Sequence, residues 1–422
     1  MISKRGPASN RDRSIPKEEP GRGFHARVVA AAALGLVGGF AALHFSTLAI
    51  FLKPIAADFG WGRAITSLAT VLSMLGMAVG AALVGPLIDR VGTARVIGTS
   101  IIGMSVLTCA LSWVPNSPVA LAALMFCIGM AGVATTPLGY LTEVSRWFGG
   151  RLGFALGVAM QGLGLGAIIF PVVTQSLIAK SGWRDAYIVL GLTGLLIGAL
   201  AWALLFSGAG RRAAQHRESV GEPEQLRSSS LSDALRQRRY WVLLVVLLSV
   251  SSAGLGTAVH GVALLTDRGI SPGDAAFIAS LSGAGVMLGR LVAGALLDRL
   301  SISLVCGTSF LLGAVGMTLT ALTQGPAVPP LVVGAFLAGL TLGVEGDLIP
   351  FAVRRYFGSR SFGGIYGTLF AVYILGGVAG PVIFGWSFDQ TGTYRQALLG
   401  GAGLCTLSAA LCLCLDRPFR LA

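Results

Sequence analysis

A few charged side chains interrupt long apolar runs in this sequence, and Arg290, Glu345 and Asp347 are the clearest cases. A charge inside hydrocarbon costs about 2.5–3.5 kcal/mol on insertion scales, so each of these residues needs a reason to be there. The planar guanidinium group of Arg290 suits two-pronged binding of a carboxylate. A buried carboxylate can bind and release a proton as its neighbours change. We therefore interpret Arg290 as a candidate substrate-binding residue, and Glu345 and Asp347 as candidate proton-coupling residues.

Structural roles are open for the same three residues. Arg290 could pair with an acid on another helix, and Glu345 lies at nearly the same expected depth. Asp347 is two positions further on, so the two carboxylates are expected to face different sides of a helix and not one cavity. Asp347 could instead pair with Arg354 or Arg355.

Three neutral polar side chains in apolar runs are further substrate-binding candidates: His44, His260 and Tyr140. Histidine titrates near neutral pH and can donate a hydrogen bond to an anion. A single histidine on a helix can equally be a packing residue, and a tyrosine can belong to the core. Both interpretations stay open for each side chain.

The elements that carry these residues are expected to be membrane-spanning helices. Hydrophobic residues make up 54% of the 422 residues and charged residues only 12%, whereas soluble domains carry about 25% charged residues. The apolar runs are long enough to cross a hydrocarbon core of about 30 Å as helices. They lie near residues 28–51, 64–86, 96–113, 119–143, 152–176, 185–206, 241–265, 275–297, 302–322, 331–353, 362–386 and 395–415.

The distribution of Lys and Arg predicts the orientation of these spans. If both termini are cytoplasmic, 25 of the 31 basic residues fall on the cytoplasmic side, as the positive-inside rule requires. The net charge of +13 therefore gives no reason to expect nucleic acid as a partner. The predicted organisation is a disordered cytoplasmic tail (1–27), a six-helix half (28–206), a cytoplasmic linker (207–239), a second six-helix half (240–415) and a cytoplasmic tail (416–422).

The two halves repeat one another. Residues 85–90 and 294–299 share the pattern Gly-x-Leu-x-Asp-Arg at an offset of 209, and residues 146–149 match 355–358 at the same offset. An even number of spans in each half gives parallel repeats, which can rock about a central site and expose it to each side in turn. The repeat predicts a transporter.

Charged residues at the cytoplasmic ends of the spans are candidates for gating. The stretch 85–92 is expected to be a charged turn between two spans. Acid–base pairs at such positions can latch the two halves in one state and release them in another. Glu143 and Arg146, three residues apart, are expected to pair with each other or with the turn at Asp89. The candidate gating residues are Asp89, Arg90, Glu143, Arg146, Asp298 and Arg299.

At residues 85–92 the sequence resembles the signature of the major facilitator superfamily. Here Thr93-Ala94 replaces the basic pair that usually follows this signature. Residues 147–162, which read Trp-Phe-x-x-Arg-x-x-x-Ala-x-Gly-x-Ala-x-x-Gly, resemble the monocarboxylate porters and oxalate–formate exchangers. The resemblance implies twelve helices, a cavity lined by spans 1, 4, 7 and 10, and a substrate-binding role for Arg290. The lysine that many monocarboxylate porters carry in span 1 is absent, with His44 and Ser46 nearby.

The expected function is secondary transport of a small organic monocarboxylate anion, with proton symport. The sequence contains no phosphate-binding loop for ATP, no catalytic constellation and no metal-ligand spacing, so we expect neither an enzyme nor a cofactor. The expected location is the plasma or inner membrane, and the expected form is a monomer. The alternatives are a proton-coupled exporter of apolar compounds, a carboxylate exchanger without proton coupling, and a non-transporting receptor.

Overall fold

The structure is a computed structural model that describes residues 22–148, 151–206 and 229–415. Within these residues it is all helical. The helices of the N-terminal half are α1 (Arg22–Val37), η1 (Phe40–His44), η2 (Phe45–Thr47), α2 (Leu48–Phe59), α3 (Arg63–Val91), α4 (Thr93–Ala110), η3 (Leu111–Trp113), α5 (Pro118–Gly132), η4 (Val133–Thr135), α6 (Pro137–Trp147) and α7 (Leu152–Phe206). Those that follow are α9 (Leu231–Leu235), α10 (Arg238–Asp267), α11 (Pro272–Leu297), α12 (Ile302–Leu322), α13 (Val328–Phe357), α14 (Phe362–Thr391) and α15 (Arg395–Cys412).

These helices form twelve membrane crossings. Ten helical segments of the described chain are long and apolar enough to span a bilayer. One of them, α7, turns at Gly182, where φ is 84°, and so supplies two crossings. The last crossing is α15, which packs along α10 and α12. The prediction of an all-helical, twelve-span membrane protein is confirmed.

The helices extend beyond the apolar runs, and this corrects one expectation. Residues 85–92 do not form a turn between spans, because α3 stays helical through Val91. Only Gly92 leaves the helix, with φ 89°, a conformation that glycine adopts without steric cost. The residues of this motif therefore lie on the last two turns of a helix, where their side chains are held at fixed angles.

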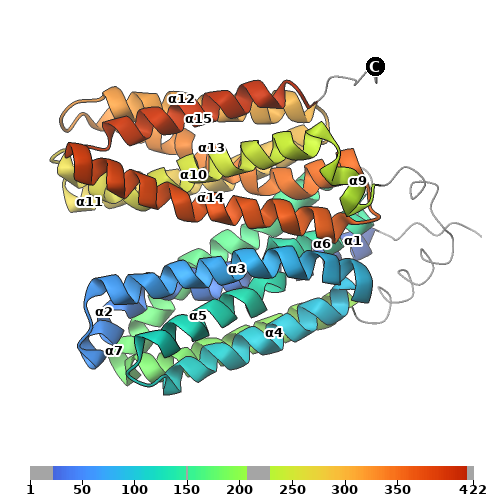
Figure 1. The fold of residues 1–422 in the computed structure, drawn as a ribbon, viewed down its shortest axis with the longest axis horizontal. Helices are drawn as coiled ribbons and strands as arrows, with labels where there is room; N and C mark the ends of the chain where they lie inside the picture. Colours follow the sequence, from blue (N-terminus) through green and yellow to red (C-terminus); the bar gives the residue numbers. More distant parts are fainter. Residues whose placement is uncertain (1–21, 149–150, 207–228, 416–422) are drawn as a thin grey trace, which may run out of the picture.

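The two six-helix halves lie side by side (Figure 1). The first half runs from blue to green in the figure, and the second from yellow-green to red. We call the end of the bundle that carries α9 and the start of α14 the linker end, and the opposite end the far end. Close crossings join the halves at the linker end, where a Cβ atom added to Gly85 would overlap the carbonyl oxygen of Gly363, and one added to Gly153 would overlap that of Gly294. Such small residues let membrane helices approach closely.

The first and fourth crossings are broken helices. Between α1 and α2 the chain passes through the π and 3-10 turns η1 and η2, and between α5 and α6 through the 3-10 turn η4. The two breaks meet, because the amide of Phe40 donates to the hydroxyl of Thr135 at 3.0 Å. Pro137 then starts α6 without needing an amide partner. The corresponding crossings of the second half, α10 and α13, are unbroken.

The expected tails and linker lie partly outside the described residues. Residues 1–21, 207–228 and 416–422 are not described, and α1 begins at Arg22, within the stretch assigned to the tail. The end of the expected linker holds α9, whose capping Ser230 hydroxyl donates to Asp233 at 2.6 Å. This hydrogen bond is the largest cause that holds the pKa of Asp233 below its usual value. The amide of Ser229 bonds to the carbonyl of Phe357 at 2.9 Å, which ties this segment to α13.

Candidate functional site

Arg290 lies on α11 where the two halves meet. Its side chain is 9% exposed, and Nη1 donates to the carbonyl oxygen of Met160 on α7 at 3.1 Å. Gly157 allows this approach, since a Cβ there would lie 2.6 Å from the Arg290 carbonyl oxygen. Nε of Arg290 has no hydrogen-bond partner, and the guanidinium forms no ion pair with a described residue. The cation is therefore buried but not neutralised by a close acid.

Glu345 lies on α13 and is fully buried. One carboxylate oxygen, Oε1, accepts a hydrogen bond from the hydroxyl of Tyr373 on α14 at 3.1 Å, while Oε2 has no partner in the described chain. The charge of Arg290 acts on this carboxylate without a direct contact. The open alternative of a direct Arg290–Glu345 ion pair is thus not the arrangement in this structure.

Asp347 is 1% exposed, and neither of its oxygens has a hydrogen-bond partner among the described residues. It therefore does not pair with Arg354 or Arg355, which corrects that alternative. Glu345 accepts a hydrogen bond from Tyr373, whereas neither Asp347 nor the hydroxyl of Tyr366 has a hydrogen-bond partner among the described residues. The expectation that the two carboxylates face different sides of α13 stays a prediction.

The two histidines have different surroundings. His260 bridges elements of the second half, with Nε2 2.9 Å from the carbonyl oxygen of Pro381 and Nδ1 3.2 Å from the hydroxyl of Tyr394. A carbonyl can only accept, so Nε2 carries the proton and Nδ1 accepts from the tyrosine. Both ring nitrogens of His260 are therefore used within the fold.

His44 and Tyr140 are buried in the first half. His44 lies in the break of the first crossing, against Phe40 with ring centroids 5.3 Å apart, and its Nε2 has no hydrogen-bond partner among the described residues. Tyr140 packs its ring over Gly35, where a side chain would overlap it, and its hydroxyl also lacks a hydrogen-bond partner in the described part of the chain. Buried polar atoms in native proteins are nearly always satisfied, so both atoms remain candidates for a ligand or a proton.

Two aspartates at the linker end hold the halves together in the same way. Asp89 on α3 accepts hydrogen bonds from the amides of Gly363 and Gly364, at the start of α14, at 2.8 and 2.7 Å. Asp298, at the end of α11, accepts from the amides of Gly153 and Phe154, at the start of α7, at 2.7 and 2.9 Å. A carboxylate at a helix N-terminus is favoured by the unpaired amides and by the helix dipole.

These contacts correct the expected latch. The partners of Asp89 and Asp298 are backbone amides of the opposite half, not the neighbouring Arg90 and Arg299. Both arginines are exposed and form no ion pair with a described residue. The expected contact of Glu143 with Arg146 is present at 3.4 Å, and Glu143 also accepts from the indole of Trp147 at 3.0 Å.

Sequence reasoning missed Tyr373, Tyr366 and Met160. The two tyrosines are seven residues apart, which places both on one face of α14, and a phenol in an apolar span needs a polar partner. That spacing was the available signal. Met160 contributes only its backbone carbonyl, so no side-chain pattern could have shown it.

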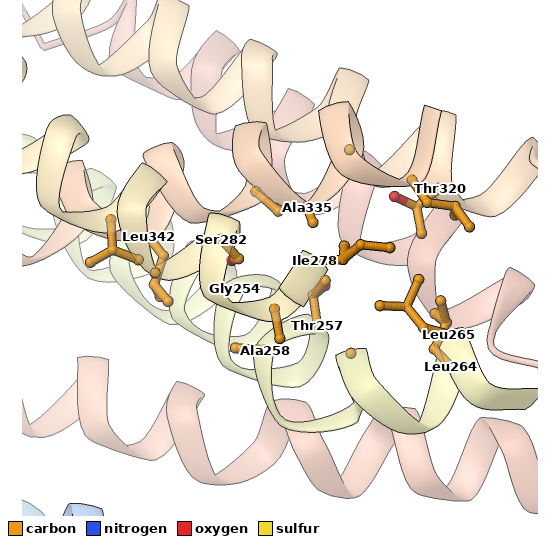
Figure 2. Close-up of a pocket in the computed structure, with 17 residues that line it drawn as sticks. Gly254, Thr257, Ala258, Leu264, Leu265, Ile278, Ser282, Thr320, Ala335 and Leu342 are labelled. Atoms are coloured by element: carbon orange, nitrogen blue, oxygen red, sulfur yellow. The ribbon is translucent and has the colours of Figure 1, made fainter. Parts of the chain in front are cut away.

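A cavity of about 280 Å³ lies in the second half beside these groups. Helices α10, α11 and α13 supply most of its walls, and α12 contributes Thr320 (Figure 2). Its lining is largely apolar. Gly254, Ser282 and Leu342 lie toward one end and Thr320, Leu264 and Leu265 toward the other.

Comparison with known proteins agrees with this fold. The family model of the Major Facilitator Superfamily matches residues 34–264 and 245–421. A gallate transporter of Pseudomonas putida is 27% identical over 79% of this chain and 83% of its own length. Monocarboxylate transporter 13 of Bos taurus is 27% identical over 90% of this chain and 86% of its own.

Solved structures show the same architecture at lower identity. The fucose:proton symporter FucP of E. coli superposes with a TM-score of 0.72 at 15% identity, covering 93% of this chain and 98% of that one. The human organic anion transporter MFSD10 gives a TM-score of 0.68 at 17% identity, covering 92% and 99%. At such identities the likeness concerns the fold alone.

Parallel six-helix halves that enclose a buried polar cluster define a membrane transporter and not an enzyme. The chain belongs to the Major Facilitator Superfamily.

Proposed function

We propose that this transporter moves an organic carboxylate anion together with a proton by alternating access. The observation that carries the proposal is the cluster of Arg290, Glu345 and Asp347. Among the described residues, the buried cation has no ion-pair partner, and each of the two buried carboxylates nearby has at least one oxygen without a hydrogen-bond partner. The names of the gallate and monocarboxylate transporters that resemble this chain support the same substrate class.

The cluster suggests how anion and proton are coupled. The field of Arg290 stabilises the negative charge on Glu345. A substrate carboxylate that binds Arg290 offsets the positive charge felt by Glu345. The negative charge on Glu345 is then less stabilised, so Glu345 binds a proton more readily. One anion and one proton enter together and the net charge of the site is unchanged. When the proton leaves to the opposite side, Glu345 again competes for Arg290 and the substrate is released.

The same proposal assigns sides to the structure. The distribution of basic residues favours a cytoplasmic linker end, and the bonds of Asp89 and Asp298 then close the site from the cytoplasm. Rocking of the halves breaks these bonds and opens that end. Glu143 and Arg146 lie at the same end, and the charge of Arg146 acts on Asp89.

Uptake into liposomes tests the function. The full chain is reconstituted, and uptake of labelled acetate, lactate, benzoate and succinate is measured with and without an inward proton gradient. We expect saturable uptake of at least one acid, accelerated several-fold by the gradient, and no uptake of the neutral analogue benzamide. Equal rates with and without the gradient would leave a carboxylate exchanger. Movement of neutral apolar compounds alone would favour the exporter and overturn the proposal.

A further inference from the structure

We infer that the transported carboxylate carries an apolar body about the size of an aromatic ring, and that this body occupies the cavity between α10, α11 and α13. The inference rests on the proposed function and narrows its substrate class. It uses three features of the cavity: its position beside the charged cluster, its volume and the chemistry of its walls.

The cavity ends next to the charged groups. Gly254 lines it, and a Cβ atom on Gly254 would lie 3.6 Å from Oε1 of Glu345. Val286 also lines it and precedes Arg290 by four residues, which is about one turn of α11. A molecule with its carboxylate at Arg290 can therefore extend its other end into the cavity.

The volume suits a ring. An engineered protein cavity of about 150 Å³ with apolar walls binds benzene, and this cavity measures about 280 Å³. An acetate ion leaves such a space unfilled. Each methylene group that is added and buried is expected to strengthen binding by roughly fourfold, so affinity should rise with the size of the apolar body.

The walls offer little to a polar molecule. Among the hydroxyl groups that line the cavity, those of Thr257 and Thr320 donate to carbonyl oxygens of their own helices at 2.8 and 2.9 Å. The hydroxyl of Ser282 forms no hydrogen bond with a described residue and can meet a single polar substituent. Sugars and other polyols need many more partners, so an acid with an apolar body is the occupant that this chemistry favours.

Two glycines in the wall allow a direct test. A Cβ atom added to Gly261 or Gly283 meets no other atom within 4 Å, and both residues line the cavity. The backbone leaves room for a side chain at both positions, so Gly261→Leu and Gly283→Leu add apolar atoms to the wall of the cavity. Gly403→Leu is the matched control, because Gly403 is exposed on α15 and its added Cβ is equally unobstructed.

The measurement is kcat/KM for uptake of acetate, butyrate and benzoate by the wild type and these variants in liposomes. We expect benzoate to exceed acetate by at least tenfold in the wild type. We expect the two cavity variants to lose at least tenfold for benzoate while acetate changes less than twofold, and the control to behave as the wild type.

Acetate uptake in the same variants reports that the protein is folded. Equal kcat/KM for all three acids would overturn the inference, and so would benzoate uptake that is unchanged in the cavity variants. Either result leaves the proposed function standing. If a lipid chain occupies the cavity instead, the cavity variants should affect uptake of all three acids equally, and this result also overturns the inference. Absence of uptake for every carboxylate overturns both.

Discussion

Glu345 and Tyr373 have different roles in the proposed proton site. The carboxyl group of Glu345 can exchange a proton, whereas the hydroxyl of Tyr373, 3.1 Å away, orients one of its oxygens. The other oxygen has no partner in the described chain. Substitutions can therefore separate the loss of the proton from the loss of the hydrogen bond.

Glu345→Gln is expected to abolish accumulation driven by a proton gradient. The amide oxygen of glutamine can still accept a hydrogen bond from Tyr373, but the amide does not take up and release a proton as a carboxyl group does. Exchange of labelled for unlabelled acid should persist, because it needs only substrate binding and rocking of the halves. Comparing gradient-driven uptake with counterflow in liposomes separates the two effects.

Tyr373→Phe is the matched control. It removes the hydrogen bond, worth about 0.5–1.5 kcal/mol net, and leaves the carboxyl group in place. Gradient-driven accumulation should survive with a KM change of a few-fold. Undiminished accumulation by Glu345→Gln would show that the coupling proton is carried elsewhere, with Asp347 the next residue to test.

Some of this site could be predicted from single residues and some could not. Arg290 and Glu345 stand out because a charge in an apolar run is costly wherever its partners lie. The role of His260 was not predictable, because its partners Pro381 and Tyr394 come from distant parts of the chain. The partner of Asp89 was also predicted wrongly. Arg90 is its neighbour in the sequence, but the amides that Asp89 binds lie in the opposite half, far away in the sequence.

At the scale of helices, the two halves hold each other through matching ends. Asp89 binds the start of α14 and Asp298 the start of α7. The four residues repeat the offset seen in the sequence, since 89 and 298 differ by 209 and 153 and 363 by 210. The repeat therefore specifies a contact between the halves and not only a similar fold in each.

Asp89→Asn and Asp298→Asn are each expected to favour opening of the linker end. Hydrogen bonds to a charged group contribute about 1.5–3 kcal/mol, and asparagine has one accepting oxygen and no charge. Each change should increase the population open at the linker end about tenfold or more, and the double variant should show the largest shift. Spin labels at the exposed positions 90 and 299 report this opening through their distance distribution.

The labelling needs a background without the partly exposed cysteines Cys109, Cys127 and Cys414. Asp274→Asn is the control, because Asp274 caps the start of α11 beside Ser271 and takes no part in the contact between the halves. An unchanged distance distribution in both single variants and in the double variant would mean that the aspartates do not hold this end closed.

Gly85→Ala should open the same end without removing a charge. The added methyl group would overlap the carbonyl oxygen of Gly363, and a backbone atom cannot move aside cheaply. We expect a shift in the same direction as for Asp89→Asn, measured with the same pair of labels. Gly403→Ala on α15 is the control, and a wild-type distribution in Gly85→Ala would contradict the tight crossing of α3 and α14.

The twelve helices were predictable because apolar length alone fixes them. Their irregularities were not. The breaks at η1 and η4 meet at the hydrogen bond of Phe40 to Thr135, a pairing between spans that no local sequence pattern indicates. The helical end of α3 was also missed, because charged residues at a membrane surface can continue a helix past its apolar run. The end of α11 at Leu297 agrees with the expected span.

For the whole molecule, the hydrogen bonds that join the halves run from Asp89 and Asp298 past Arg290 to Gln161, whose side-chain amide donates to the carbonyl oxygen of Met287. Arg290 is the residue of this series that belongs to the proposed site, since its bond to Met160 joins α11 to α7. A substrate that binds Arg290 competes with this bond. Substrate binding and the rocking of the halves are then linked through the side chain of Arg290, which is the central residue of the proposed transport cycle.

The affinity of the purified protein for benzoate, compared between the wild type and Arg290→Ala, tests this claim most directly. Truncating a buried charge that binds an opposite charge costs about 2–5 kcal/mol, so we predict that the Kd rises at least about thirtyfold. The ligand-induced rise in Tm should disappear accordingly. Arg395→Gln, an exposed change at the start of α15, should bind as the wild type does. Equal affinity in Arg290→Ala and the wild type would contradict the account.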